Sequence, residues 1–275
     1  MNAIDLAPTR KGYVDGPYGQ IHYREAGSGA PLVLLHQTSQ SSVQYEHALP
    51  LLAAAGFRVI ALDTPGYGMS DLPLAPPSVD EYAAAIAVAI SALCHEPAAL
   101  VGHHTGAAVA GAVAANHPEQ VRHLILHSPP VYTAQERSER QARPRLDQSP
   151  REDGSHFMAR WKVSHGKTGN TASLAATHMS TLCAMIAGDS EWYGHQASFS
   201  YDLGDALTRV ICPTTILSNT GDIIHHLAER ASRIKPTFQY TEIEGGTSQI
   251  IWDEAERWSQ AIIALINNPP AKPAA

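Results

Sequence analysis

Short apolar stretches alternate along the chain with longer segments of helical periodicity. The apolar stretches are rich in Val, Ile and Leu, and polar residues do not recur at every second position, as expected for strands that are buried on both faces. Strands that alternate with helices favour a parallel sheet with helices on its faces. The pattern therefore predicts an α/β fold, with strands at 31–36, 57–63, 98–104, 121–128 and 214–220.

The intervening segments predict five helices and a lead-in hairpin. Ala-rich and Leu-rich helical spacing occurs at 43–55, 79–94, 105–116, 223–234 and 254–266, and residues 12–29 predict a β-hairpin that opens the sheet.

The alternation stops between residues 130 and 208, where charged and polar residues dominate. A segment inserted after the strand at 121–128 would lie over the carboxyl ends of the strands, where open parallel sheets bind ligands. We therefore expect residues 1–129 and 209–268 to form the core, residues 130–208 to form a cap or lid, and residues 269–275 to form a flexible tail.

Composition and net charge limit the kinds of molecule that the protein is expected to bind. The 275 residues are 44% hydrophobic and 16% charged, which is typical of a globular protein, and the net charge is −7. A chain without excess positive charge is a poor match for nucleic acid or an anionic membrane, and a small-molecule substrate stays compatible with it. A homo-oligomer is compatible with the sequence.

Three widely spaced cysteines, Cys94, Cys183 and Cys212, form neither a disulfide framework nor a zinc motif. The first twenty residues contain no apolar core of a signal peptide, and the most apolar helical stretch is too short to cross a bilayer. These features predict a cytoplasmic protein.

The most informative motif joins a predicted strand to a predicted helix. Gly102-His103-His104-Thr105-Gly106 has the spacing of a nucleophile elbow, in which two glycines flank the exposed residue of a strand-to-helix turn. With LVLLHQ, ALDTPGYGMSD and the late Gly221-Asp222, the sequence resembles the α/β-hydrolase superfamily from about residue 12 to residue 266. The resemblance implies the α/β-hydrolase fold with a lid.

Two positions depart from the Ser-His-Asp triad that the resemblance implies. His104 stands where the family usually has the serine nucleophile, and Thr247 follows Gly246 where the general-base histidine is usual. Only the acid, Asp222, matches. An acyl-enzyme mechanism therefore cannot be carried over. We expect the His104 ring to occupy the space of the missing histidine and to pair with Asp222, since histidine tolerates the positive φ of an elbow.

Such a pair has a definite chemistry. A carboxylate that accepts one ring N–H fixes the tautomer and makes the other nitrogen more basic. His104 would act as general base or as nucleophile. The backbone N–H groups of Gln37 and Thr105 match the family's oxyanion-hole positions, and the side chains of Gln37 and Thr38 are further candidate donors.

Other histidines are candidates for the pocket. His36, at the oxyanion loop, is more readily explained as a structural residue, and His225 lies three residues after Asp222. His156 and Trp161 belong to the predicted lid, where Trp161 would line the pocket or fill the lid's own core.

A zinc or iron site from His36, His104, His156 and a carboxylate stays open, with three protein ligands and a free position. The sequence lacks a paired-histidine metal motif, however, and adjacent histidines such as His103 and His104 point opposite ways on a strand.

The sequence thus predicts a cofactor-free hydrolase of a small ester, lactone or activated ketone. Two alternatives stay open: a cofactor-free lyase or oxygenase in which His104 removes a proton, and a pseudohydrolase that binds a small ligand without chemistry.

Overall fold

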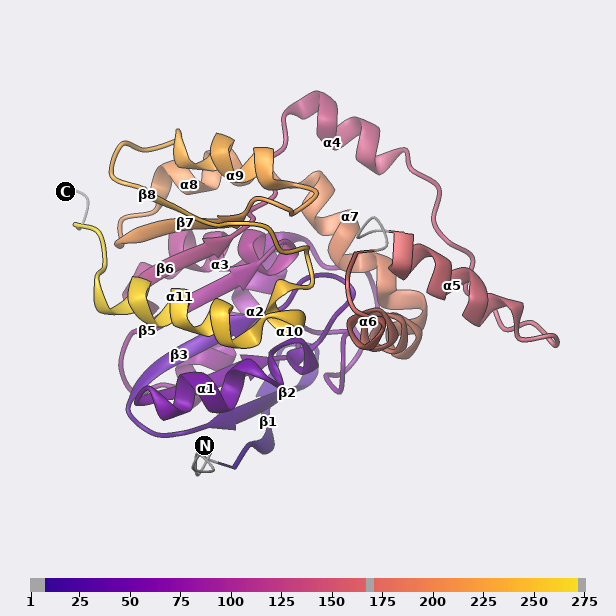
Figure 1. The fold of residues 1–275 in the computed structure, drawn as a ribbon, viewed down its shortest axis with the longest axis horizontal. Coiled ribbons are helices and arrows are strands. Elements are labelled where there is room, and N and C mark those ends of the chain that lie inside the picture. The colour runs from indigo at the N-terminus through magenta and orange to yellow at the C-terminus, as the bar shows by residue number, and fades with distance from the viewer. Residues whose placement is uncertain (1–7, 167–170, 272–275) are drawn as a thin grey trace.

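An eight-stranded sheet forms the centre of the molecule (Figure 1). The computed structural model describes residues 8–166 and 171–271, so the last four residues of the predicted tail lie outside the described residues. The strands follow the order β1-β2-β4-β3-β5-β6-β7-β8. Their bounds are Arg10–Gly16 (β1), Gly19–Ala26 (β2), Ala30–Leu35 (β3), Phe57–Leu62 (β4), Ala98–His103 (β5), Val121–His127 (β6), Thr214–Asn219 (β7) and Gln239–Ile243 (β8).

Strand direction confirms the predicted architecture. β1 and β2 form an antiparallel hairpin and β2 pairs antiparallel with β4, whereas the strands from β4 to β8 pair parallel. The sequence pattern did not predict β8. Its five residues, QYTEI, are mostly half-buried or exposed because they form the sheet edge, so they lack the apolar run of the inner strands.

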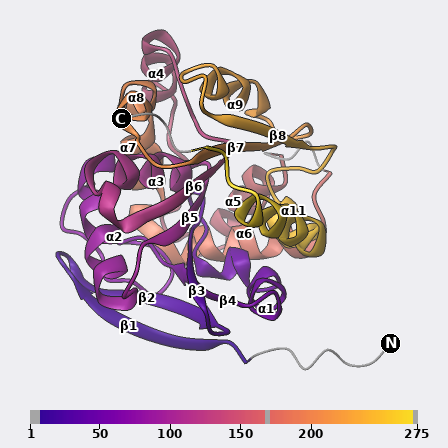
Figure 2. The same ribbon diagram turned by 90° about the vertical axis from the view of Figure 1, so that its left-hand side faces the viewer.

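Helices cover both faces of the sheet (Figure 2). One face is packed by α1 (Ala48–Ala54), α10 (Ile250–Asp253) and α11 (Ala255–Asn267), with the fully buried Trp258 at its centre. The other is packed by α2 (Val79–Leu93), α3 (Thr105–Asn116), α8 (Leu203–Arg209) and α9 (His225–Ser232). Short 3-10 turns lie at Ser42–Tyr45, Pro118–Gln120 and Gly188–Trp192.

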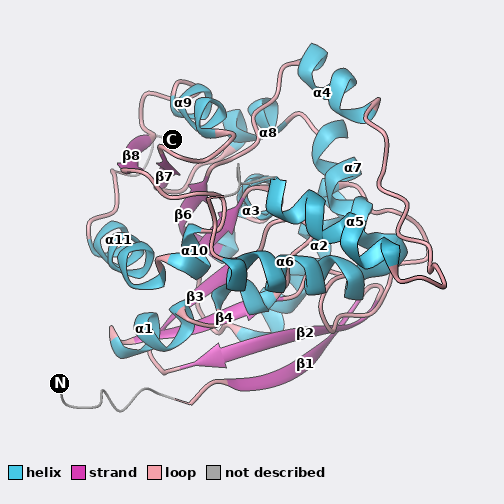
Figure 3. Ribbon diagram, turned by 45° about the vertical axis from the view of Figure 1, so that its right-hand side comes forward, coloured by secondary structure: helices cyan, strands magenta, loops and turns pink. Residues whose placement is uncertain are grey.

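Four more helices lie to one side of this layered core (Figure 3). They are α4 (Ala134–Gln141), α5 (Ser155–Gly166), α6 (Leu174–Ala187) and α7 (Tyr193–Ser200). The next helix, α8, packs on α3 through Leu203 and Leu207 and so belongs with the core helices. Over residues 8–166 and 171–271, no helix combines the length and apolar character that crossing a bilayer requires.

Close packing fixes the path from β5 into α3. A Cβ at Gly102 would lie 2.2 Å from the carbonyl oxygen of Gly106, and a Cβ at Gly106 would lie 2.2 Å from the carbonyl oxygen of Leu35. Only glycine allows the helix to approach both its own strand and the end of β3 this closely. The two glycines therefore set where His104, between them, is presented.

The close approach of α3 to the end of β3 at Gly106 leads to a prediction about stability. Gly106→Ala should lower the free energy of unfolding by about 1–3 kcal/mol, because the added methyl group must displace backbone. Gly166→Ala is the matched control, since a Cβ there meets nothing within 4 Å. Thermal unfolding of both variants followed by circular dichroism checks this, and equal melting temperatures would contradict it.

Two imidazoles are buried in β6. His123 bonds the hydroxyl of Thr215 through Nε2 at 3.1 Å, and His127 bonds the amide oxygen of Asn219 through Nε2 at 3.0 Å. Burial lowers the pKa of each imidazole from 6.5 to about 4. Both rings are therefore neutral in the folded protein at neutral pH.

Acid should consequently destabilise the fold. Below pH 6.5 the unfolded chain binds protons at these positions that the folded chain does not, so the free energy of unfolding should fall as pH falls toward 4. The loss is about 3 kcal/mol for each imidazole across that window. Urea titrations between pH 7 and 5 check this: His123→Gln should flatten the pH dependence, whereas the exposed His95→Gln should not. A wild-type stability independent of pH in that range would refute the explanation.

Candidate active site

His104 lies at the turn between β5 and α3. Its backbone has φ 51° and ψ −115°, and its N–H donates to the carbonyl oxygen of His127 at 3.0 Å. The positive φ turns the chain sharply, as expected for an elbow, and projects the ring from the end of the strand. The side chain remains 15% exposed, so the ring is accessible from solvent.

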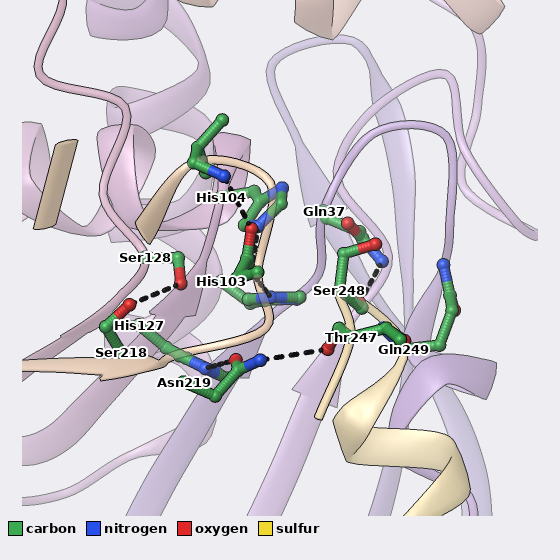
Figure 4. Close-up of polar contacts among 12 residues, drawn as sticks. Gln37, His103, His104, His127, Ser128, Ser218, Asn219, Thr247, Ser248 and Gln249 are labelled. Carbon is green, nitrogen blue, oxygen red and sulfur yellow. Dashed lines mark hydrogen bonds and ion pairs between the residues drawn. The ribbon is translucent and has the colours of Figure 1, made fainter. Parts of the chain in front are cut away.

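The predicted partner of His104 is in place. Nε2 of His104 (Figure 4) lies 2.7 Å from Oδ2 of Asp222, which sits on the turn after β7 and has a fully buried side chain. The backbone N–H of Ile224 donates to the other carboxylate oxygen at 3.0 Å. Burial raises the pKa of Asp222, but the His104 and His103 imidazoles outweigh it and hold that pKa well below its usual range. Asp222 is therefore an ionised acceptor, and Nε2 of His104 donates to it.

His103 lies beside the same carboxylate, contrary to the expectation that adjacent histidines diverge. Its ring centroid is 4.3 Å from that of His104, and its Nε2 is 4.0 Å from Oδ2 of Asp222. The expectation was wrong because strand geometry ends at His103, and the positive φ of His104 swings the second ring back. His127 stacks on the other side of His103, with centroids 4.5 Å apart.

Hydrogen-bond partners assign the same tautomer to all three rings. Gln44 donates its amide N–H to Nδ1 of His103 at 3.2 Å, and Trp258 donates its indole N–H to Nδ1 of His127 at 3.2 Å. Each of these rings therefore carries its proton on Nε2, as His104 does. Burial, with repulsion from His104 and His127, lowers the pKa of His103 well below its ordinary value, so His103 is neutral.

The tautomer leaves Nδ1 of His104 as the unprotonated nitrogen. His104 lines a cavity of about 220 Å³. In the described part of the chain, no side chain bonds Nδ1, so its lone pair is available to a molecule in the cavity.

The cavity lies at the carboxyl ends of the parallel strands. Residues that follow β3, β5, β6, β7 and β8 line the cavity. Residues of the helical segment, by which we mean α4 to α7 and their connecting turns, line it as well. This agrees with the expectation that a ligand site lies at the carboxyl ends of the parallel strands. Its lining is Gln37, Thr38, Ser39, Gln40, His104, Thr105, Pro130, Tyr132, Arg140, Arg143, Ser180, Trp192, His195, Ser198, Phe199, Ile223, Ile224, Ser248 and Gln249.

The three predicted oxyanion residues all line the cavity, but they are not equally available. The backbone N–H of Gln37 donates to the side chain of Gln44 at 3.2 Å, which occupies one expected donor. The Gln37 amide donates to the carbonyl oxygen of Ser248 at 3.0 Å and has a second proton. Thr105 begins α3, where backbone N–H groups have no partner within the helix.

The structure does not bring His36, His225 or Thr247 into the cavity lining. His36 donates Nδ1–H to the carbonyl oxygen of Gln37 at 2.9 Å and accepts from Thr64, so it braces the loop, as expected of a structural residue. His225 bonds Ser218 at 3.0 Å and faces Glu242 at 3.3 Å. The Thr247 hydroxyl accepts from the N–H of Gln249 at 3.0 Å.

The two predicted lid residues are also absent from the cavity lining. His156 accepts the backbone N–H of Arg151 at 3.2 Å and packs against Phe157. Trp161 stacks with His165 within α5. Both side chains therefore serve the local structure of the helical segment, and its cavity-facing residues come from α4, α6 and α7 and their flanking turns.

A buried ion pair ties this segment to the core. Arg160 on α5 donates to the carboxylate of Glu191 at 2.9 Å, and the Ser39 hydroxyl donates to the same oxygen at 3.0 Å. Ser39 belongs to the loop after β3 that lines the cavity. One carboxylate thus connects α5 with the loop at the centre of the site.

The predicted metal set does not converge, since His36 and His156 bond elsewhere. A different trio does: His103, His104 and Asp222 offer donor atoms within 4.8 Å of one another. A metal would have to displace both Nε2 protons and the 2.7 Å hydrogen bond. A second trio, His225, Glu229 and Glu242, lies outside the cavity lining.

Sequence reasoning missed several residues that shape the site. Gln44 and Asn219 orient imidazoles through contacts that no local pattern reveals. Within the charged and polar stretch that follows residue 130, the run from Arg137 continues α4, and Arg140 and Arg143 line the cavity. A signal was present: Thr133 and Glu136 form a capping box, which marks a helix start.

Comparison with known proteins agrees with this architecture. A sequence model of the alpha/beta hydrolase fold family matches residues 30–209. Bifunctional epoxide hydrolase 2 of Rattus norvegicus is 33% identical over 132 residues, which is 44% of this chain and 22% of that protein. The match thus spans about a fifth of that relative. A putative non-heme chloroperoxidase of Synechocystis sp. is 25% identical over 264 residues, 90% of this chain and 94% of that protein.

A solved structure gives the same result for the fold. The bromoperoxidase from Bacillus anthracis superposes with a TM-score of 0.77 at 18% identity, covering 94% of this chain and all of that one. Because the family model matches well over half of the 275 residues, the chain belongs to the α/β hydrolase fold family.

Proposed function

We propose that the protein is a cofactor-free hydrolase of a small ester, lactone or activated ketone, with His104 as its general base. The observation that carries the proposal is the 2.7 Å bond from Nε2 of His104 to the buried Asp222 carboxylate. That bond leaves Nδ1 unprotonated on a ring that lines the cavity. The hydrolase names among the relatives, such as the rat epoxide hydrolase, support the same reaction class.

The proposed reaction needs only water as second substrate. Nδ1 of His104 removes a proton from a water molecule while the oxygen of that water bonds to the substrate carbonyl carbon. The imidazolium that forms is stabilised by the ionised Asp222. With an ester or lactone, the imidazolium then returns the proton to the leaving oxygen as the C–O bond breaks, giving the acid and the alcohol. With an activated ketone, the proton goes to the leaving carbon as the C–C bond breaks.

The negative charge on the carbonyl oxygen needs donors. The N–H of Thr105 at the start of α3 and the second amide proton of Gln37 are the proposed donors, since both residues line the cavity with His104. The backbone N–H of Gln37 would have to leave Gln44 to contribute. This revises the expected oxyanion site from two backbone groups to one backbone group and one side chain.

Removal of the imidazole should abolish most turnover. His104→Asn is preferable to His104→Ala because asparagine tolerates a positive φ, so the elbow is retained. We expect kcat to fall by about 10²–10⁴-fold on activated short-chain esters and lactones, with chelator present. His178→Gln, which removes an exposed histidine of α6, is the control and should match wild type. Full activity in a folded His104→Asn protein would refute the role.

Asp222→Asn tests the orienting carboxylate. We expect kcat/KM to fall by about 10–100-fold, because the amide no longer fixes the ring as a charged acceptor does. A folded Asp222→Asn protein that keeps the wild-type kcat/KM would count against the pair.

Product mass separates the proposal from its alternatives. Hydrolysis adds the elements of water to the substrate, lyase chemistry adds nothing, and oxygenation adds oxygen. A ligand recovered unchanged after long incubation would instead indicate a binding protein. Mass spectrometry of the reaction mixture reads all of these outcomes in one experiment.

A further inference from the structure

The cavity has an unusual charge for a protein that is acidic overall. The chain carries a net charge of −7, yet Arg140 and Arg143 are the only Lys, Arg, Asp or Glu residues among the side chains that line the cavity in the described structure. A cavity lined by one sign of charge concentrates ligands of the opposite sign. The start of α3 at Thr105 adds a partial positive charge at the His104 end.

Other arginines of this stretch have polar side-chain partners. Outside the cavity, Arg137 pairs with Asp202 at 3.1 Å, Arg145 donates to the amide oxygen of Gln196 at 2.7 Å, and Arg151 pairs with Asp147 at 3.2 Å. No carboxylate of the described residues pairs with Arg140 or Arg143. Two guanidinium groups are therefore available to an anionic molecule in the cavity.

Arg140 is held in position by aromatic rings. Its guanidinium carbon lies 4.3 Å from the ring centroid of Tyr132 and 5.7 Å from that of Phe199. Stacking on rings restrains the guanidinium plane while its N–H groups remain free to donate at the edge. Tyr132 and Phe199 are buried, so this arrangement is part of the packed wall.

One part of the remaining wall is apolar and fits an apolar body. Trp192, Phe199 and Ile224 line the cavity, and they pack together as a small cluster. A planar carboxylate matches the fork of a guanidinium bidentately, whereas an uncharged substrate would leave both arginines without a partner.

From these features we infer that the substrate is a carboxylate: a small molecule with an apolar body whose anionic group binds Arg140 and Arg143 while its reacting carbonyl lies at His104. The inference deepens the proposed function and rests on it for the reaction, but the recognition of the anion can be measured without turnover. Arg140 and Arg143 are then specificity residues.

The test is a pair of probes that differ only in charge. Binding of phenylacetate and of phenylacetamide is measured by calorimetry at low ionic strength with wild type, the Arg140→Gln/Arg143→Gln double variant, and Arg151→Gln. The last removes the same charge from the same segment outside the cavity lining. Circular dichroism verifies the fold of each variant.

We expect phenylacetate to bind wild type and Arg151→Gln at least about tenfold more tightly than phenylacetamide, since hydrogen bonds to charged groups are the stronger ones. In the double variant this ratio should fall to about one. Equal binding of the two probes to wild type, absence of phenylacetate binding, or an equal loss in Arg151→Gln would each overturn the inference.

Measurement of ester hydrolysis distinguishes a failure of this inference from a failure of the proposed hydrolase function. The ratio of kcat/KM for 4-nitrophenyl hemisuccinate over 4-nitrophenyl butyrate should be high in wild type and low in the double variant. If wild type hydrolyses neither ester but retains the preference for phenylacetate, the hydrolase proposal fails and carboxylate recognition stands. If both esters are hydrolysed with a ratio that the double variant leaves unchanged, the inference fails and the hydrolase proposal stands.

Discussion

The buried charge of Asp222 is the constraint on which the candidate site depends. An ionised carboxylate with a fully buried side chain is costly unless it is paired and hydrogen-bonded. Its partners come from two places: the N–H of Ile224 on its own turn, and the imidazoles that β5 delivers from the far side of β6. The strand order β5-β6-β7 therefore has to be complete before the charge is compensated.

The elbow at residues 102–106 supplies the imidazole that pairs with Asp222, and its backbone conformation is tightly restricted. His104 takes a positive φ, and the glycines on either side of the turn are enclosed so tightly that a Cβ at either would collide with backbone. Those collisions would involve the end of β3 as well as α3, so the same contacts that aim His104 also position the loop that carries Gln37. Ring, carboxylate and loop are thus placed by one packing arrangement.

The periodicity of the sequence predicted the local elements, that is, the helices and strands. The details of the site depend on contacts between residues that are far apart in the chain, and these were not predicted. The helix at 105–116 and the inner strands were predictable because elements that are buried on both faces consist of nearly uninterrupted runs of apolar residues. The proximity of His104 and Asp222 was predictable from the turn spacing and the resemblance. The tautomers were not, since they depend on Gln44 and Trp258, which lie 59 and 131 residues from the rings they touch. The convergence of His103 and His104 was not predictable either, because the positive φ of His104 turns its own ring back toward that of His103.

The matched tautomers of the three neighbouring rings have a consequence for where a proton can travel. His103 faces Asp222 with a nitrogen that already carries hydrogen, and its other nitrogen is occupied by the amide of Gln44. The ring of His103 stacks on that of His127 and is tilted against that of His104, and no hydrogen bond joins one of these three rings to another. In the proposed reaction, the proton that His104 takes up therefore has no path through these three rings, and it is exchanged with what occupies the cavity.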